Sequence, residues 1–567
     1  MGEMLATALS TFISDLATLF SNLTKGFGDL DLACTSANHA LGVINGFPSA
    51  RKVLLKYWYT QDVNSDYGSW KWVATPVMLY VIGSWVLGVG YIGRWRKRNP
   101  RGLPYPPGPR GYPLIGNILD LPRTYQWEAF SEWTGKYGDI IYLEVLKQPI
   151  LVLNSLKRVE DLLEKRSANY SDRPKAPMLR ELMGWKNLMP CMDHNAELRA
   201  NRKIFNQYFS QSAVQKYRPL QLDSVQLLLN RMAKAPEDVV PHIGHHTSGL
   251  VARLMYSIDI DEDTEYMSIV DGMVKAFEEA AIPGRFLVDA FPVLQYVPSW
   301  FPGAGFQKFG QQSNELLKKL QIVPFELVKE RMTQGASSWC VASDMIERLP
   351  PAFDPSREET EVLFRKVAST AHIGGADTTF AALRTFLYAM AAYPEVQRKV
   401  QAEIDREVDA GRLPTFGDRE RLRYVDAMLK EVLRWVTVIP FALPHVSSED
   451  DEYDGYFIPK GTIVLANSWF AQHNPESYSN PLEFNPERYL NKVTSVPDPA
   501  IPAFGYGRRV CPGMYFANET LYIVSVSILA TFDVLPLEAG GGMKIIDGPL
   551  SGLAQFKCSV KPRAGRV

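Results

Sequence analysis

Long stretches of the chain place apolar residues three and four positions apart, which is the spacing of one helix face. The clearest of these helical stretches are residues 312–333, 359–392, 394–408 and 420–436. Apolar runs with the length and residue types of strands are shorter and occur at residues 139–146, 149–155 and 461–468. The pattern predicts a mainly α fold with small β sheets, in one large unit without internal repeats.

A different pattern occupies residues 72–93, which contain no charged residue. About 20 apolar residues are enough to cross a bilayer, so this stretch predicts a transmembrane helix. A buried core helix is the alternative interpretation. The basic residues that follow, in 94–101, place the C-terminal bulk in the cytosol by the positive-inside rule. We therefore expect a single-pass membrane protein with most of its length on the cytosolic side.

The segments around this span divide the chain further. Residues 1–71 form an N-terminal extension, expected to be lumenal, with an amphipathic helix near its start and a glycosylation sequon at Asn22. Residues 94–113 combine the basic flank with a proline-rich hinge that holds the chain extended. The main body is then expected to be residues 114–567.

Composition excludes several classes of protein. The 567 residues are 46% hydrophobic and 22% charged, which supports a large core rather than disorder. The formal net charge of −1 gives no reason to expect a nucleic-acid partner. The five cysteines lie far apart and form no Cys-x-x-Cys pair, so neither a zinc site nor a disulfide scaffold is indicated.

One cysteine has surroundings that suit an anion. Cys511 lies in the stretch FGYGRRVCPG, residues 504–513, among glycines and two arginines. A thiolate needs donated hydrogen bonds and positive charge to persist, and the glycine backbone and the arginines can supply both. A helical pattern begins just after Cys511, and a helix N-terminus favours an anion. The stretch predicts a stabilised thiolate that serves either as a nucleophile or as a metal ligand.

The same stretch resembles the signature of a known family. Its Phe504, Gly507, Arg509, Cys511 and Gly513 match the heme-binding signature of the cytochrome P-450 enzymes, Phe-x-x-Gly-x-Arg-x-Cys-x-Gly, at every defined position. In that family the cysteine thiolate is the axial ligand of the heme iron; it pushes electron density onto the iron and favours cleavage of the O–O bond.

This resemblance extends over roughly residues 103–560 and is similar to microsomal and fungal members of the family. It implies the cytochrome P-450 fold for a heme-thiolate catalytic domain at residues 114–567. It also implies heme b (iron protoporphyrin IX) as cofactor, with Cys511 as the metal ligand. The expected location is the membrane of the endoplasmic reticulum, with the catalytic domain in the cytosol.

A second motif lies within the predicted helix 359–392. Its adjacent Gly374 and Gly375 each cost the helix about 1 kcal/mol, which indicates a close approach by something such as a flat cofactor. The next polar residues, Asp377 and Thr378, resemble the acid–alcohol pair of the family. The resemblance implies that both are catalytic: Thr378 would stabilise the reduced oxygen, and Asp377 would help to deliver protons through water.

A third motif is the pair Glu431 and Arg434, which share one face of a predicted helix. Alone such a pair is common on solvated helix faces. The resemblance implies that Glu431 and Arg434 join Arg488 in a network that holds the heme-side core. That role is structural rather than catalytic.

The resemblance also implies contacts to the heme. His445, Arg202 and Arg509 are candidates for the two propionates, because a guanidinium group can donate two hydrogen bonds to one carboxylate. Leu198 stands where the family usually has a tryptophan, so the propionate hydrogen bond of that tryptophan is not expected here. The expected cofactor-binding set is Phe504, Gly505, Arg509, Gly513, Arg202, His445, Gly374 and Gly375.

The substrate pocket is expected from four largely apolar stretches. They are residues 178–189, 286–291, the residues before Gly374, and 438–443. In the last stretch Phe441, Ala442 and Leu443 carry no charge that would hold an acid. The pocket therefore predicts a lipophilic small molecule, and the resemblance to fungal members points to a terpenoid or another secondary metabolite.

The resemblance implies a monooxygenase that uses O2 and electrons from NADPH. The chain has no Rossmann or flavin-binding motif, so we expect a separate NADPH-dependent flavin reductase as partner. Two alternatives keep the heme thiolate: a reductase-independent peroxide isomerase and a noncatalytic heme-thiolate sensor. The Asp377–Thr378 pair favours oxygen activation, because isomerases of the family often lack it, and no added sensory domain favours a sensor.

Overall fold

The computed structural model describes residues 98–567 except 283, 337, 491–495, 537–542 and 565–567. Leu103–Val567 form one compact unit. The predicted transmembrane helix at 72–93 and the extension at 1–71 lie outside the described residues. Within the part of the chain that is described, no helix is both long enough and apolar enough to cross a bilayer.

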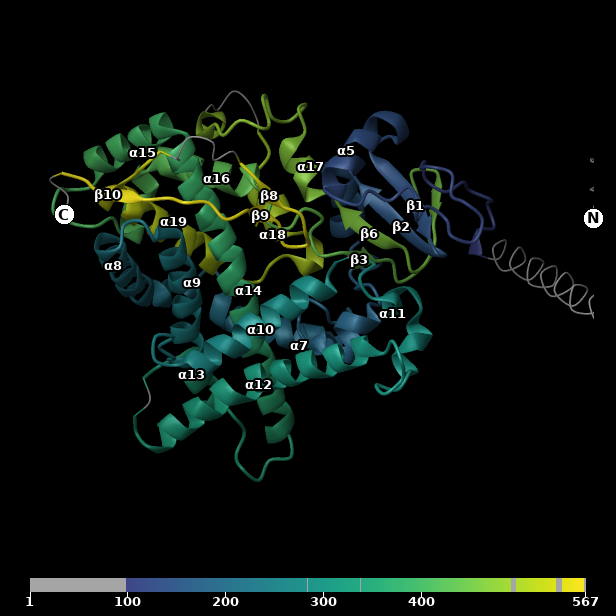
Figure 1. Ribbon diagram of the computed structural model, residues 1–567, viewed down its shortest axis with the longest axis horizontal. Coiled ribbons are helices and arrows are strands. Elements are labelled where there is room, and N and C mark those ends of the chain that lie inside the picture. The colour runs from purple at the N-terminus through teal and green to yellow at the C-terminus, as the bar shows by residue number, and fades with distance from the viewer. Residues whose placement is uncertain (1–97, 283, 337, 491–495, 537–542, 565–567) are drawn as a thin grey trace, which may run out of the picture. The chain divides into compact units, whose positions relative to one another are not determined.

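Helices form most of this unit (Figure 1). The longer helices are α5 (Gln126–Tyr137), α7 (Ala196–Phe209), α8 (Arg218–Lys234), α9 (Val239–Tyr256), α10 (Thr264–Ala280), α12 (Gly305–Thr333), α13 (Val341–Glu347), α14 (Arg357–Ala392), α15 (Pro394–Glu407), α16 (Arg423–Trp435) and α19 (Met514–Thr531). The short helices are α6 (Leu156–Val159), α11 (Leu287–Ala290), α17 (Ser468–His473) and α18 (Ala500–Phe504). Single 3-10 or π turns are η1 (Glu160–Lys165), η2 (Pro177–Leu182), η3 (Trp185–Asn187), η4 (Val214–Tyr217), η5 (Pro292–Tyr296), η6 (Phe416–Arg421), η7 (Pro486–Tyr489) and η8 (Gly507–Arg509).

The strands are short and form four small sheets. They are β1 (Ile140–Val145), β2 (Gln148–Leu153), β3 (His445–Val446), β4 (Asp451–Tyr453), β5 (Tyr456–Ile458), β6 (Ile463–Ala466), β7 (Phe532–Val534), β8 (Ile545–Ile546), β9 (Gly552–Leu553) and β10 (Val560–Pro562). The largest sheet has the order β1-β2-β6-β3, and the others pair β10 with β7, β4 with β5, and β8 with β9.

The four-stranded sheet lies beside α5 at one end of the unit (Figure 1). Its first hairpin turns at Leu146 and Lys147, whose φ angles of 49° and 69° are the left-handed pair that a tight two-residue turn requires. β2 then pairs in parallel with β6, and β3 pairs antiparallel with β6. The last pairing fixes the position of His445, which lies opposite Val464.

Helix α14 runs through the middle of the helical part (Figure 1). Its 36 residues include no proline, and Glu358 and Glu359 in the first turn suit the positive end of the helix dipole. The helix ends at Tyr393, whose φ of −124° and ψ of 71° are not helical, because the residue before a proline is disfavoured in helical geometry. α14 packs against α7, α9, α12 and α19.

Two hydrophobic clusters meet along α14. The first joins α9, α10 and α12 to the first half of α14, including Val367 and Ala371. The second joins α15, α16 and α19 to the second half of α14, from Ala382 onward. Residues 374–379 belong to neither cluster as buried members, although Ala376 and Thr379 are buried, so the two clusters leave a break in the middle of this central helix.

The predicted elements correspond closely to the observed ones. The four predicted helices are the major parts of α12, α14, α15 and α16, and the three predicted strands are β1, β2 and β6. The expectation of a mainly α fold with small β sheets is therefore confirmed for the described residues.

Candidate active site

The glycine-rich stretch around Cys511 forms a tight loop between α18 and α19. Gly507 has a φ of +56°, and a Cβ built on it would lie 2.0 Å from the carbonyl oxygen of Leu163. Only glycine fits this position, because a side chain would collide with backbone. Gly505 also has a positive φ, of +82°, but the nearest atom to its Cβ position is 3.9 Å away. The close approach that the loop requires is therefore at Gly507.

Cys511 lies directly ahead of the N-terminus of α19, as its sequence predicts. Its backbone N–H donates to the carbonyl of Phe504 at 2.7 Å, which closes the loop. Burial raises the pKa of the Cys511 thiol, whereas a hydrogen bond from the N–H of Gly513 and the charge of Arg202 lower it. The last two effects favour the thiolate. The loop thus presents a sulfur that can act as an anionic ligand.

Three guanidinium groups gather next to this loop. Arg173 and Arg509 are buried, and Arg202 is half-buried. Arg509 donates to the carbonyls of Ser171 and Met192, at 2.7 and 2.6 Å. Arg173 donates to the carbonyl of Leu443, and Arg202 to that of Val510. Within the described residues, none of the three arginines forms an ion pair with a carboxylate.

The three positive charges lie close enough to disfavour one another. Burial, and then the nearby Arg509, lowers the pKa of Arg173 to about 9. Burial also lowers the pKa of Arg509, to about 10. Because a buried charge normally has a counterion, an excess of cations in one place indicates an anionic ligand. Two carboxylates are the groups that guanidinium forks bind best.

His445 lies beside the same arginines. Its Nδ1–H donates to the carbonyl of Tyr170 at 2.6 Å, so Nε2 is left as an acceptor in the neutral ring. Burial, and then the charge of Arg173, lowers the pKa of His445 to about 3. A carboxylate placed next to Nε2 would raise that pKa and let the ring donate a second hydrogen bond.

On α14, the two adjacent glycines Gly374 and Gly375 have different surroundings. A Cβ at Gly374 would meet no atom within 4 Å, although the residue lies in the middle of the central helix. The Thr378 hydroxyl donates to the Gly374 carbonyl at 2.7 Å. A Cβ at Gly375 would lie 3.3 Å from Val251 of α9, so this second glycine permits close helix packing. An open space therefore borders Gly374 and the Thr378 hydroxyl.

Asp377 is partly buried and makes no hydrogen bond or ion pair with another described residue. Burial raises its pKa to about 6, with further contributions from Glu278 and Asp271. A carboxyl group with this pKa exchanges its proton near neutral pH, which suits a proton donor.

The predicted network of Glu431, Arg434 and Arg488 is present. Two hydrogen bonds of 2.8 Å join Arg434 to Glu431, and neither side chain is exposed. Arg488 adds a contact of 3.1 Å to Glu431. The remaining donors of Arg434 reach the carbonyls of Gln472, Pro481 and Glu483. The network joins α16 to the segment before the cysteine loop and takes no part in a cavity.

The apolar stretch 441–443 divides between two environments. The Phe441 ring packs against Trp127 and Phe130, at centroid distances of 6.4 and 5.9 Å. Ala442 has a φ of +52°, a strained conformation for a residue other than glycine. The carbonyl of the following Leu443 accepts from Arg173 at 2.6 Å. This strained turn connects the predicted pocket wall to the cluster of arginines.

Two residues of the site were not singled out by sequence reasoning. Arg173 lies in none of the motifs from which the site was predicted. Gly507 is a defined position of the cysteine signature, but Gly505 was named as the cofactor contact in its place. For Arg173 no local spacing gave a signal, because its partners Pro190, Leu443 and Arg509 are distant in sequence.

Together these features fit one kind of cofactor. The open space at Gly374 suits a flat group, the cluster of arginines with His445 suits its carboxylates, and Cys511 suits a metal at its centre. A heme with two propionates has these three properties. The chemistry of the residues present therefore agrees with heme binding.

Comparisons with known proteins give the same family. A family model described as cytochrome P-450 matches residues 106–557. Cytochrome P-450 monooxygenase COX1 of Coprinopsis cinerea is 41% identical over 483 residues, which cover 82% of this chain and 93% of that protein. Tryptamine 4-monooxygenase of Psilocybe cyanescens is 36% identical over 506 residues, which cover 86% and 99%. Cytochrome P-450 monooxygenase claR of Ampulloclitocybe clavipes is 37% identical over 499 residues, which cover 86% and 89%.

Proposed function

Because the chain belongs to the cytochrome P-450 family, we propose that it is a membrane-anchored monooxygenase that oxidises a lipophilic small molecule with O2 and electrons from NADPH. Monooxygenases of this family use heme b, which supplies the iron that binds and activates O2. The observation that carries the proposal is the position of Cys511, at a helix N-terminus beside three arginines, two of which are buried.

The residues around Cys511 hold the heme. Cys511 would bind the heme iron through its thiolate, which the N–H of Gly513 and the charge of Arg202 favour. Arg173, Arg509 and His445 bind the propionates, together with Arg202. Binding would offset part of the cost of burying these cations, since the two propionates would bring negative charge beside them.

The residues of α14 manage protons. Asp377 holds a proton near neutral pH and passes it toward the open space at Gly374. The Thr378 hydroxyl, which donates to the Gly374 carbonyl, would be able to turn and donate a hydrogen bond into the open space instead. The acid–alcohol pair favours a monooxygenase over a peroxide isomerase, because an isomerase needs no external protons.

We further propose that a separate NADPH-dependent flavin reductase supplies the electrons. The chain carries no Rossmann or flavin-binding motif, so NADPH cannot be bound here by that means. Arg508 is exposed within the cysteine loop itself and offers a positive charge to an acidic partner.

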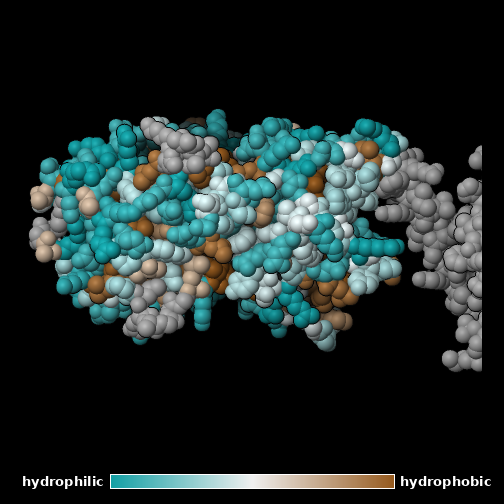
Figure 2. All heavy atoms as spheres, turned by 90° about the horizontal axis from the view of Figure 1, so that it is seen from above, coloured by the Kyte–Doolittle hydropathy of each residue, from teal (hydrophilic) through white to brown (hydrophobic). Residues whose placement is uncertain are grey.

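A membrane location is supported by two features. The uncharged residues 72–93 have the length and composition of a span. Within the catalytic unit, large hydrophobic side chains are exposed from α11 to the residues before α12; they include Leu287 (67%), Val293 (71%), Tyr296 (79%) and Trp300 (78%). Figure 2 shows hydrophobic patches on an otherwise largely hydrophilic face of the molecule. The expected site is the endoplasmic reticulum membrane, with the catalytic unit in the cytosol.

The substrate is proposed to be a lipophilic secondary metabolite, with a terpenoid as the first class to test. The apolar character of Ala442 and Leu443 supports a substrate without an acid group. One relative is named for its action on tryptamine, so an aromatic amine is the second class to test.

Reconstitution tests this function. Full-length protein in vesicles, supplied with a fungal NADPH-dependent flavin reductase, is incubated with a terpenoid panel and with tryptamine. A substrate that shifts the Soret band and accelerates NADPH consumption, with an oxygenated product by mass spectrometry, would support the proposal. Turnover of an organic peroxide without NADPH or reductase would instead support the isomerase alternative.

A further inference from the structure

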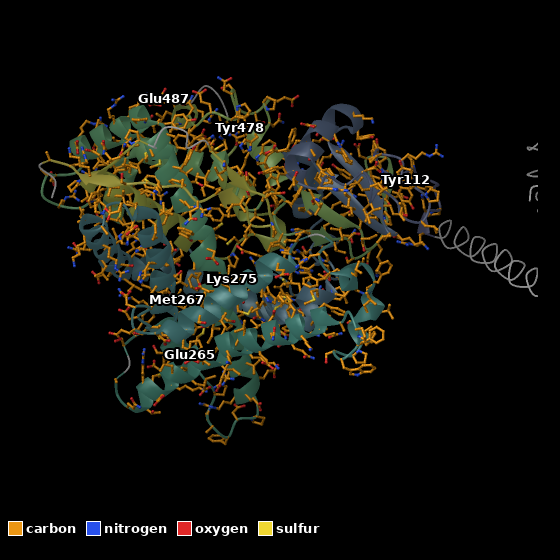
Figure 3. All side chains as sticks on the ribbon, viewed as in Figure 1. Tyr112, Glu265, Met267, Lys275, Tyr478 and Glu487 are labelled. Atoms are coloured by element: carbon orange, nitrogen blue, oxygen red, sulfur yellow. The ribbon has the colours of Figure 1, made fainter. Side chains whose placement is uncertain are left out.

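Helices α8 and α9 pack side by side and, with the loop 257–263 that leads into α10, enclose a small hollow (Figure 1). Figure 3 labels Glu265 in the first turn of α10, directly after this loop. The volume of the hollow, about 20 Å³, is enough for one water-sized group. All of its lining residues come from α8, α9 and the loop, so the hollow is separate from the cysteine loop and from α14.

The most buried polar residue of this lining is His246 of α9, which is 5% exposed. Its Nδ1 lies 3.1 Å from the Ser224 hydroxyl of α8. Its Nε2 is buried and has no hydrogen-bond partner among the described residues. Burial lowers the pKa of His246 to about 4, so the ring is neutral at neutral pH and carries one N–H.

The hydrogen bonds decide which ring nitrogen of His246 carries this proton. If Nδ1–H donated to Ser224, the hydroxyl proton of Ser224 would have no acceptor among the described residues, and Nε2 would lack a donor. If the Ser224 hydroxyl donates to Nδ1, only the Nε2–H is left without a partner. The second arrangement is favoured, because each unsatisfied buried polar group is costly. The hollow therefore has an N–H donor at its inner end and lacks an acceptor for it.

Two partly exposed arginines also line the hollow. Arg231 of α8 is already engaged, since it donates to His245 and pairs with Asp261. Arg253 of α9 donates through Nη2 to Asp259 at 2.9 Å, whereas its Nε and Nη1 have no partner among the described residues. The carboxylate of the lining, Asp259, thus already contacts a cation, while Arg253 keeps unused donors.

These unused donors indicate a ligand with negative charge and several acceptor atoms. One donor is the N–H of His246 at the inner end, and the others belong to the more exposed Arg253, so the acceptors must point in different directions. The oxygens of a tetrahedral phosphate group do this, and a guanidinium group binds phosphate through charge-assisted hydrogen bonds. The small volume admits one oxygen at the inner end and leaves the other oxygens beside Arg253.

We propose that the hollow between α8, α9 and residues 257–263 is a binding site for a phosphate group. One phosphate oxygen accepts from the Nε2–H of His246, and others accept from the unused donors of Arg253. Arg231 adds positive charge from α8. The site lies outside the residues that hold the heme, so the inference goes beyond the proposed function and does not depend on it.

Isothermal titration calorimetry of the full-length, heme-loaded protein in a glucoside detergent tests the site. The probes are inorganic phosphate, glycerol 3-phosphate and acetate, at one ionic strength set with chloride. His246→Asn keeps a polar group at the position of Nδ1 and removes the donor at Nε2, whereas His246→Gln places an amide N–H at the position of Nε2. Arg253→Met removes the unused donors at a partly exposed position. Arg285→Met is the matched control, because Arg285 pairs with Glu279 outside the hollow.

We expect the parent to bind phosphate, and His246→Asn and Arg253→Met to weaken binding about tenfold or more, since each removes a hydrogen bond to a charged ligand. His246→Gln and Arg285→Met should stay within about threefold of the parent. Arg253→Met decides the question by itself if His246→Asn does not fold.

The probes also distinguish the source of the phosphate group. Glycerol 3-phosphate binding at least as tightly as inorganic phosphate would support a site for the phosphate group of a larger molecule, and binding of inorganic phosphate alone would support a site for the free ion. A parent that binds no phosphate, a parent that binds acetate equally well, or an Arg253→Met variant that binds phosphate like the parent would overturn the proposal.

Discussion

The two halves of the active site have opposite electrostatics. Around Cys511, three arginines gather, two of them buried, and none forms an ion pair with a carboxylate among the described residues. Around Asp377, the neighbouring charges are carboxylates of α10. The network of Glu431, Arg434 and Arg488 differs from both, because each of its charges contacts a charge of opposite sign within the protein.

This contrast separates residues that bind from residues that react. Cations without a counterion are costly until an anionic ligand arrives, so they indicate where the heme carboxylates and the thiolate belong. Acids close to one another are easily protonated, so they indicate where protons are held. A network in which every charge already contacts an opposite charge has neither property and only stabilises the fold.

The largest expected effect comes from Cys511→Ser. Loss of the thiolate should abolish the strongly red-shifted Soret band of the reduced, CO-bound protein. Turnover should also fall by more than about 1000-fold, because no other residue of the loop can push electron density onto the iron. The measurement is the CO difference spectrum of parent and variant. A parent without that band would contradict the assignment of Cys511, and an Arg508→Gln variant serves as a control for changes in the loop.

The second effect is that of Asp377→Asn, which breaks the acidic half of the site. Turnover should fall on the order of 100-fold, the usual contribution of a positioned general acid, while the Soret spectrum stays that of the parent. Steady-state kinetics with the flavin reductase, beside an absorption spectrum, provide the measurement. A loss of heme in this variant would place Asp377 in the binding half instead.

The third effect tests the cationic half. Arg173→Met should accelerate heme dissociation about tenfold or more, since a propionate loses a charged hydrogen-bond partner. Transfer of heme to an excess of apomyoglobin measures the rate. Arg384→Met is the matched control, because Arg384 is also partly buried but lies against Phe380, outside the cluster of arginines. Equal rates in both variants would argue against propionate binding by Arg173.

The smallest effect is on stability. The pKa of Asp377 is raised from 3.8 to about 6 in the folded protein, so its contribution to stability is present below pH 3.8 and is lost as pH rises through about 6. Asp377→Asn should therefore be more stable than the parent at pH 8, by about 1–3 kcal/mol, and equal to it at pH 4. Urea unfolding of both proteins at the two pH values measures the difference; a parent that is the more stable at pH 8 would show that Asp377 is paired.

Much of the fold followed from local patterns. The helical spacing at 394–408 predicted α15 within a residue or two, because one face of that helix is buried and the other is not. The limits of α14 were also predicted, since Pro394 ends it. In contrast, the amphipathic pattern could not indicate that Phe441 packs against Trp127 and Phe130, because those rings are brought together by the sheet.

The sequence by itself determined the chemistry that depends on adjacent residues. A cysteine among glycines before a helix, an acid next to an alcohol, and a Glu-x-x-Arg pair are all set by the covalent order of the chain. Only the tertiary structure decided which charges lie near them: Arg173, Arg202 and Arg509 converge from three segments, and two carboxylates of α10 are near enough to Asp377 to raise its pKa. The reason is physical. The spacing of residues along one helix fixes which of them are neighbours, whereas only the packing of whole helices brings together residues that are distant in sequence.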